Sequence, residues 1–138
     1  EDMFASQVAS YNDNKLVGTT ATTATANFTP GHPLYRQIAA LAKLRTSTPA
    51  LTRGRQVLRA REDKPGLLAI SRFDPTNNSE VLLAFNTSDA PITRNVQIET
   101  ASTRFRAMAG KCGSVTAPGA IRLTLPALGY AVCAAETR

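Results

Sequence analysis

Residues 32–45 read HPLYRQIAALAKLR, and this stretch decides how the chain is organised. Its apolar side chains recur at the i, i+4 and i+7 spacing of an amphipathic helix: Leu34, Ile38 and Leu41. Pro33 suits a first helical turn, where its missing N–H costs nothing, and His32 before it is expected to cap the helix. Since the residue before Pro49 is disfavoured in a helix, we predict a helix over 32–47. A lone helix of this length is marginal in water, so its apolar stripe must pack on a partner.

The residues before this helix divide into two parts. A short helix is predicted near the start, because three apolar residues fall at helical spacing: Phe4, Val8 and Tyr11. Asp2 is the expected cap of that helix. Residues 18–29 are mostly Thr and Ala without an apolar period, which predicts a loop that packs on another element or stays mobile.

Beyond Gly54 the apolar period changes to that of short strands separated by turn residues. Leu67–Phe73 is nearly apolar on both faces and is expected to be a central strand. In the next strand, Val81, Leu83 and Phe85 are expected to face inward. The predicted fold class is mainly β: an antiparallel Greek-key β-sandwich of seven to eight strands, preceded by one amphipathic helix and an N-terminal loop segment.

The net charge of +6 comes mainly from scattered arginines. The densest group, at 53–61, alternates with uncharged residues and is interpreted as the exposed face of a strand. A nucleic-acid surface more often combines clustered basic residues with aromatic ones, and only Phe105 between Arg104 and Arg106 fits that pattern. No apolar run approaches the roughly 20 residues that cross a bilayer. Neither a nucleic-acid nor a membrane partner is predicted.

Candidate catalytic residues are few. Six of the ten carboxylates lie at predicted turns or turn edges, where a structural role is expected: Asp13, Glu62, Asp63, Asp74, Glu80 and Asp89. His32 is the only histidine, which leaves no zinc constellation and no motif that supports a Ser-His-acid set. No catalytic, cofactor-binding or metal-binding residue is therefore predicted.

Cys112 and Cys133 are the only two cysteines, and antiparallel packing could bring them together. A disulfide that closes a loop of this size contributes about 3 kcal/mol in the chain-entropy description. Two cysteines without a metal-binding pattern favour a disulfide and an oxidising compartment. The alternative is two unpaired thiols, with Cys133 acting as a small core residue.

Several segments resemble parts of the α-amylase family of glycoside hydrolases. The first set is similar to the end of the family's catalytic barrel, where the last barrel helix leads into the C-terminal β-domain: HPLYR (32–36), LR (44–45) and PALTRG (49–54). The second set resembles the long loop after the eighth barrel strand of bacterial members: EDMFASQ (1–7) and YNDN (11–14). LTLPALGYAV (123–132) resembles the terminal hairpin of the β-domain.

This resemblance implies a division of the chain at Gly54. Residues 1–54 would be the end of the barrel, with the loop after strand eight, the last helix and a linker turn, and 55–138 the C-terminal all-β domain. In that family the catalytic carboxylates follow barrel strands four, five and seven, so all would precede Glu1. Two site assignments follow from the resemblance. A possible rim of the parent's active site is Tyr11, Asn12, Asp13 and Asn14, and the barrel-docking helix face is Leu34, Ile38 and Leu41.

The leading hypothesis is a non-catalytic C-terminal domain of a secreted or periplasmic bacterial hydrolase of α-glucans, starch or maltodextrin. Its partner would be the catalytic barrel of the same polypeptide; no cofactor is expected in this chain, and calcium is possible in the parent. One alternative is a carbohydrate-binding module, but the chain has no Trp and only three Tyr for stacking on sugars, so weak or no carbohydrate contact is expected. The other alternative is a protein-interaction β-domain.

Overall fold

A computed structural model of the chain describes residues 4–12 and 14–136. The chain forms two compact units, Glu1–Leu44 and Arg45–Arg138, and each is described by itself. The predicted cap Asp2 lies outside the described residues. Within the described ranges, no helix combines the length and the apolar character needed to cross a bilayer.

The first unit begins with irregular structure. The predicted helix over Phe4, Val8 and Tyr11 is wrong, because only one 3-10 turn forms there, η1 (Ala9–Tyr11). Ser6 explains the difference: its Oγ accepts a hydrogen bond from the Val8 N–H at 3.1 Å and donates to the Val8 carbonyl. Such local side-chain bonds compete with helix formation. The segment at 18–29 is a loop, as predicted, apart from one isolated bridge at its edge between Lys15 and Thr22.

Helix α1 (Pro33–Thr46) confirms the prediction from the apolar spacing. His32 caps it as expected, since its Nδ1 accepts a hydrogen bond from the Leu34 N–H at 3.1 Å. The predicted linker turn contains a short second helix, α2 (Pro49–Arg53). Thr48 is extended, as the residue before a proline prefers, and Pro49 then begins the new helix at its first turn.

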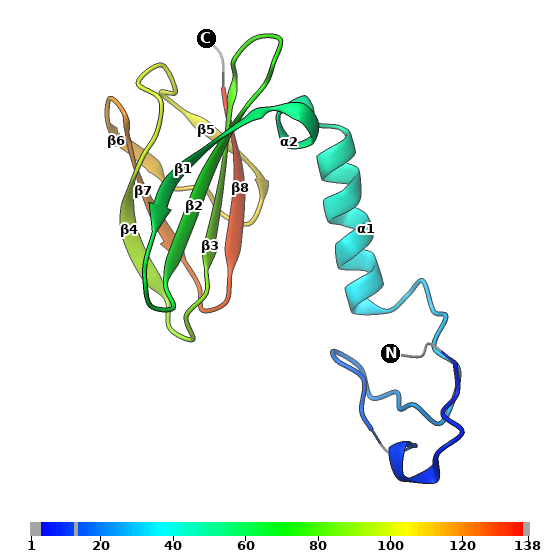
Figure 1. The fold of residues 1–138 in the computed structure, drawn as a ribbon. Helices are drawn as coiled ribbons and strands as arrows, with labels where there is room; N and C mark the ends of the chain where they lie inside the picture. Colours follow the sequence, from blue (N-terminus) through cyan, green and yellow to red (C-terminus); the bar gives the residue numbers. More distant parts are fainter. Residues whose placement is uncertain (1–3, 13, 137–138) are drawn as a thin grey trace. The chain divides into compact units, whose positions relative to one another are not determined.

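The second unit is a mainly β sandwich of two antiparallel sheets, as predicted (Figure 1). Its eight strands are β1 (Arg55–Arg61), β2 (Leu67–Phe73), β3 (Glu80–Asn86), β4 (Ile92–Gln97), β5 (Phe105–Ala109), β6 (Ser114–Ala117), β7 (Ala120–Leu125) and β8 (Tyr130–Ala135). The five-stranded sheet has the order β1-β2-β3-β8-β5, and the three-stranded sheet has the order β4-β7-β6. Strand β2 lies between β1 and β3, as its apolar composition predicts. The Greek-key connection remains a prediction.

The main core lies between the two sheets. It combines side chains of both: Leu67, Ala69, Leu82, Ala84, Ile92, Val96, Ile98, Ile121, Leu123, Leu125, Ala131 and Cys133. The predicted orientation of β3 is wrong, because Leu82 and Ala84 belong to this core, which places Val81, Leu83 and Phe85 on the opposite face. Since β3 is apolar on both faces, its sequence does not reveal which face points inward. Because Val81, Leu83 and Phe85 face away from the core, the five-stranded sheet has a second apolar surface.

Candidate functional site

Two carboxylates meet in the second unit, where sequence reasoning expected none to do so. Arg59 Nη2 donates to Glu80 Oε1 at 3.1 Å and to Glu99 Oε1 at 2.7 Å. Ser71 Oγ also donates to Glu80 Oε1, and Arg59 Nε donates to Ser71 Oγ at 2.8 Å. The other oxygen, Glu80 Oε2, accepts from the Glu99 N–H at 3.0 Å and from Ser102 Oγ at 2.7 Å. We call these five residues the Glu80 cluster.

The Glu80 cluster is built for stability and not for catalysis. A pair of carboxylates is the equipment of a glycosidase, but a catalytic acid or base must reach its substrate. The Glu80 side chain is 1% exposed, and both of its oxygens are occupied by donors of the protein itself. The cluster instead ties β1, β2 and β3 to the segment at 98–102, which leads out of the three-stranded sheet.

The sequence missed this cluster for a geometric reason. The sequence predicts an exposed strand face for Arg59, yet its side chain is only 7% exposed. Val57 pairs with Ser71, so the alternation of the strand places Arg59 on the same face as Ser71, within reach of Ser71 and Glu80. The sequence predicts a turn edge for Glu80, which is in fact buried at the start of β3. The sequence of β1 does not show which of its faces the rest of the chain covers.

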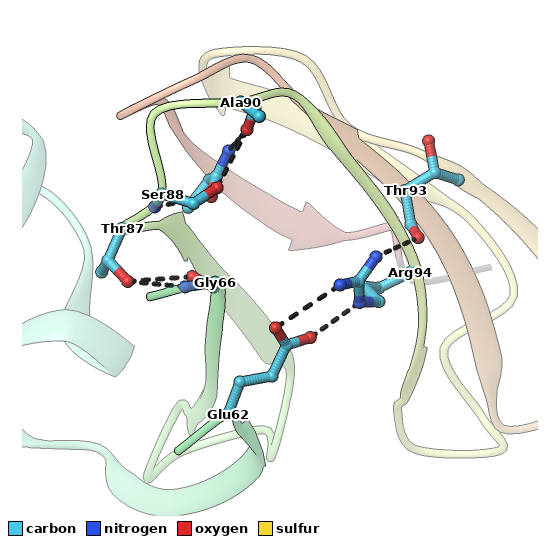
Figure 2. Close-up of polar contacts among 8 residues, drawn as sticks. Glu62, Gly66, Thr87, Ser88, Ala90, Thr93 and Arg94 are labelled. Atoms are coloured by element: carbon cyan, nitrogen blue, oxygen red, sulfur yellow. Dashed lines mark hydrogen bonds and ion pairs between the residues drawn. The ribbon is translucent and has the colours of Figure 1, made fainter. Parts of the chain in front are cut away.

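A second ion pair joins the turn after β1 to β4 (Figure 2). Glu62 Oε1 accepts from Arg94 Nε at 2.7 Å, and Glu62 Oε2 accepts from Arg94 Nη2 at 3.5 Å. Arg94 Nη1 also donates to the Thr93 carbonyl, which holds the guanidinium in place. The hydrogen bond from Arg94 is the main reason that the pKa of Glu62 lies below its ordinary value of 4.5, against the opposing effect of desolvation.

This pair predicts a pH-dependent difference in stability. Because the pKa of Glu62 is lowered on folding, its contribution is present above the ordinary carboxyl value and is lost as pH falls through the lower folded value. We expect the melting temperature of the wild type to exceed that of Glu62→Gln at pH 7 and low salt. The difference should shrink steadily below pH 4.5. Thermal melts from pH 7 to acid measure it.

Asp63→Asn is the matched control, because Asp63 is the adjacent residue and its ion pair with Arg61 is solvent-exposed at 3.4 Å. An exposed pair of this kind contributes little, so this variant should melt close to the wild type throughout. A Glu62→Gln deficit that stays constant into acid would contradict the assignment to the ion pair.

The predicted disulfide between Cys112 and Cys133 is confirmed, with a Cα–Cα distance of 5.8 Å. Cys133 is fully buried in β8, and Cys112 lies in the connection from β5 to β6. Gly113 allows that connection to pass close to β7, since a Cβ there would collide with the Arg122 carbonyl. A disulfide is consistent with an extracellular or periplasmic location.

The five-stranded sheet has a second apolar surface on the side that faces away from the core. In one row across four strands, Leu58 pairs with Ile70, Ile70 with Leu83, and Leu83 with Val132. The apolar residues of this whole surface, which we call the outer face, are Leu58, Leu68, Ile70, Val81, Leu83, Phe85, Tyr130, Val132 and Ala134. Leu58 is 57% exposed, whereas Val81 and Val132 are each 4% exposed and are already covered within the described chain. The rings of Phe85 and Tyr130 stack at 6.4 Å. Apolar surfaces of this kind mark interaction sites.

The stripe of α1 is also exposed. No residue of α1 is buried among those that the structure describes, and Ile38 is 66% exposed. The protein-interaction alternative required this stripe to be buried within the chain, so its exposure argues against that alternative.

Three of the predicted rim residues are described, and they lie in one turn region of the first unit: Tyr11, Asn12 and Asn14. Tyr11 is exposed, and the Asn14 N–H donates to the Tyr11 carbonyl at 3.2 Å. The hydroxyl of Thr23 donates to the same carbonyl, which fastens this turn to the following loop. Asn12 Oδ1 is buried without a hydrogen-bond partner in the described chain. Asp13 lies outside the described residues.

The described residues form neither a sugar-stacking surface at the hollow near the β2–β3 turn nor a metal site. The hollow is lined by Arg55 and Phe73, among others, but the Arg55 guanidinium covers the Phe73 ring at 4.2 Å from its centroid. That ring is 1% exposed, so it offers no surface for stacking a sugar. Residues 4–12 and 14–136 contain no group of three or more His, Cys, Asp or Glu that could hold a metal ion. The calcium prediction concerned the parent and stays a prediction.

Comparisons with known proteins give one curated relative and several solved structures. No protein-family model matches the chain. The chain is 36% identical over 140 residues to an alpha-amylase of Streptomyces lividans, in a match that covers 100% of this chain and 15% of that relative.

Two solved structures illustrate the similarity of fold. AmyP in complex with maltose has a TM-score of 0.64 at 15% identity, covering 94% of this chain and 30% of its own. The acarbose-soaked debranching enzyme of Nostoc punctiforme has a TM-score of 0.60 at 19% identity, covering 75% and 20%. At these identities the similarity concerns the fold, and in every case this chain spans a minor part of the relative.

Proposed function

Since the chain is homologous over its whole length to one part of an α-amylase-family enzyme, we propose that it is the non-catalytic C-terminal part of such a glycoside hydrolase. The parent acts on α-glucans such as starch and maltodextrin. Residues 1–54 complete the catalytic barrel, and 55–138 form a domain that packs on the barrel and stabilises it. The parent is secreted or periplasmic, which the disulfide supports.

The outer face is the observation that carries this proposal. A sheet of a free-standing sandwich usually presents polar side chains to water on its outer side. Here the row from Leu58 to Val132 is apolar on every strand that it crosses. Fully burying an exposed Leu side chain such as Leu58 contributes about 1.5–3 kcal/mol, so docking of this surface stabilises both partners.

Two features of the first unit support the same arrangement. The α1 stripe is apolar and exposed, and a helix of this length needs a partner surface to be stable. The turn at Tyr11, Asn12 and Asn14 is suited to the rim of the active-site face, because loops after barrel strands build that face. We assign Asp13 to the same rim from its position in the sequence.

The docking proposal is tested by hydroxyl-radical labelling of the isolated chain and of the longer polypeptide that includes the barrel. Leu58, Leu83, Leu34 and Ile38 should be labelled severalfold more slowly in the longer polypeptide, because the barrel covers them. Leu128 is the matched control, a leucine that is 74% exposed in the turn before β8 and outside both surfaces. Its labelling should be equal in the two proteins. Equal labelling of Leu58 and Ile38 as well would overturn the proposal.

A further inference from the structure

The outer face is bordered by positive charge. At the end of the face near the β2–β3 turn, Gln56 pairs with Arg72, Arg72 with Val81, Val81 with Ala134, and Ala134 with Arg106. This row therefore places an arginine on either side of Val81 and Ala134. Within the five described strands, no position on this side is Asp or Glu; the acidic residue that follows β8, Glu136, pairs with Arg104 at 3.6 Å.

Arg72 is an incompletely satisfied charge. Its Nη1 donates to Gln56 Oε1 at 3.3 Å, a neutral acceptor, and its Nε is buried with no hydrogen-bond partner in the described chain. Buried polar groups are nearly always paired, and a half-buried guanidinium normally has a carboxylate. Arg59 and Arg94 each have one within the same unit. The acceptor for Arg72 is therefore expected from outside the described residues.

Arg106 and the overall charge distribution point the same way. The Arg106 side chain is exposed and forms no hydrogen bond or ion pair with any residue that the structure describes. By sequence, the second unit contains 13 Lys and Arg against seven Asp and Glu, whereas the first unit contains three of each. The whole net charge of +6 thus lies in the unit that carries the outer face.

We propose that the outer face binds a surface of the catalytic part of the same polypeptide that is apolar at its centre and presents carboxylates to Arg72 and Arg106. This inference rests on the proposed function and adds the charge of the partner surface. A guanidinium binds a carboxylate through two parallel hydrogen bonds, so two such pairs fix the position of one surface on the other. The apolar centre supplies the affinity, and the charges at its border select the register.

The test measures radical labelling of Phe85, on the outer face, in the longer polypeptide. Arg72→Glu and Arg106→Glu should each raise the labelling rate about tenfold, since like charges then face each other. Arg72→Lys keeps the charge and should raise it less. Arg122→Glu is the matched control, an exposed arginine on β7 of the other sheet, and should leave the rate unchanged.

Leu58→Asp separates this inference from the proposed function. It places a charge in the apolar surface itself and should also expose Phe85. If Leu58→Asp raises the rate while both Arg→Glu variants behave like Arg122→Glu, the acidic partner surface is refuted and docking stands. If Phe85 is labelled in the wild-type longer polypeptide as fast as in the isolated chain, both proposals fail. Arg106 is exposed, so its variant keeps the test valid even if Arg72→Glu does not fold.

Discussion

Replacing Glu80 by alanine should lower the free energy of unfolding of this chain by about 3–5 kcal/mol, the usual cost of removing one partner of a buried ion pair. The carboxylate accepts hydrogen bonds from Arg59, Ser71, Ser102 and the Glu99 backbone. Without it, the Arg59 guanidinium stays buried, with only the half-exposed Glu99 as a charged partner. Urea denaturation at pH 7, followed by circular dichroism, measures the loss.

Two variants make this result specific to the Glu80 cluster. Asp63→Ala removes an exposed carboxylate and should change the free energy of unfolding by less than about 1 kcal/mol. Arg59→Met combined with Glu80→Leu removes both charges and should recover part of the loss, because replacing a whole buried pair with apolar residues is often neutral. A Glu80→Ala protein as stable as Asp63→Ala would show that the cluster does not hold the strands together.

Removing the disulfide should have the next largest effect. Cys112 and Cys133 are 21 residues apart, and opening a loop of that length costs about 3 kcal/mol by release of chain entropy in the unfolded state. The double variant Cys112→Ala/Cys133→Ala should therefore unfold at a lower urea concentration than the wild type. Alanine is chosen because a serine hydroxyl would be unsatisfied at the fully buried position of Cys133.

Reductant provides the internal control for the disulfide. Adding it should lower the urea midpoint of the wild type toward that of the double variant and leave the variant unchanged. Two free thiols titrated in the denatured, unreduced wild type would contradict the disulfide itself. A midpoint in the variant equal to that of the oxidised wild type would contradict its role in stability.

Features that depend on local chemistry were predictable from the sequence. The spacing of Leu34, Ile38 and Leu41 predicted α1, and His32 before Pro33 predicted its cap; the structure confirms both. The central position of β2 followed from its apolar composition. These features depend on residues that are close together in the sequence, so the local sequence is enough to predict them.

Features that depend on register were not predictable. The orientation of β3 is decided by the second sheet, because both of its faces are apolar. The burial of Arg59 depends on which face of β1 the rest of the chain covers, and its partners Glu80 and Glu99 are 21 and 40 residues away. The outer face exists only where β1, β2, β3 and β8 pair, so no single strand reveals it. For this reason the predicted docking surface was limited to one helix stripe.

The most direct test of the central claim is a hydrolysis assay with soluble starch, comparing the purified chain with the longer polypeptide under the same conditions. Released reducing ends are the readout, and maltoheptaose serves as a second, defined substrate. The account predicts that the longer polypeptide releases reducing ends and that the 138-residue chain releases no more than a buffer blank. Reducing ends released by the chain alone, in proportion to its concentration, would contradict the proposal that this chain carries no catalytic residue.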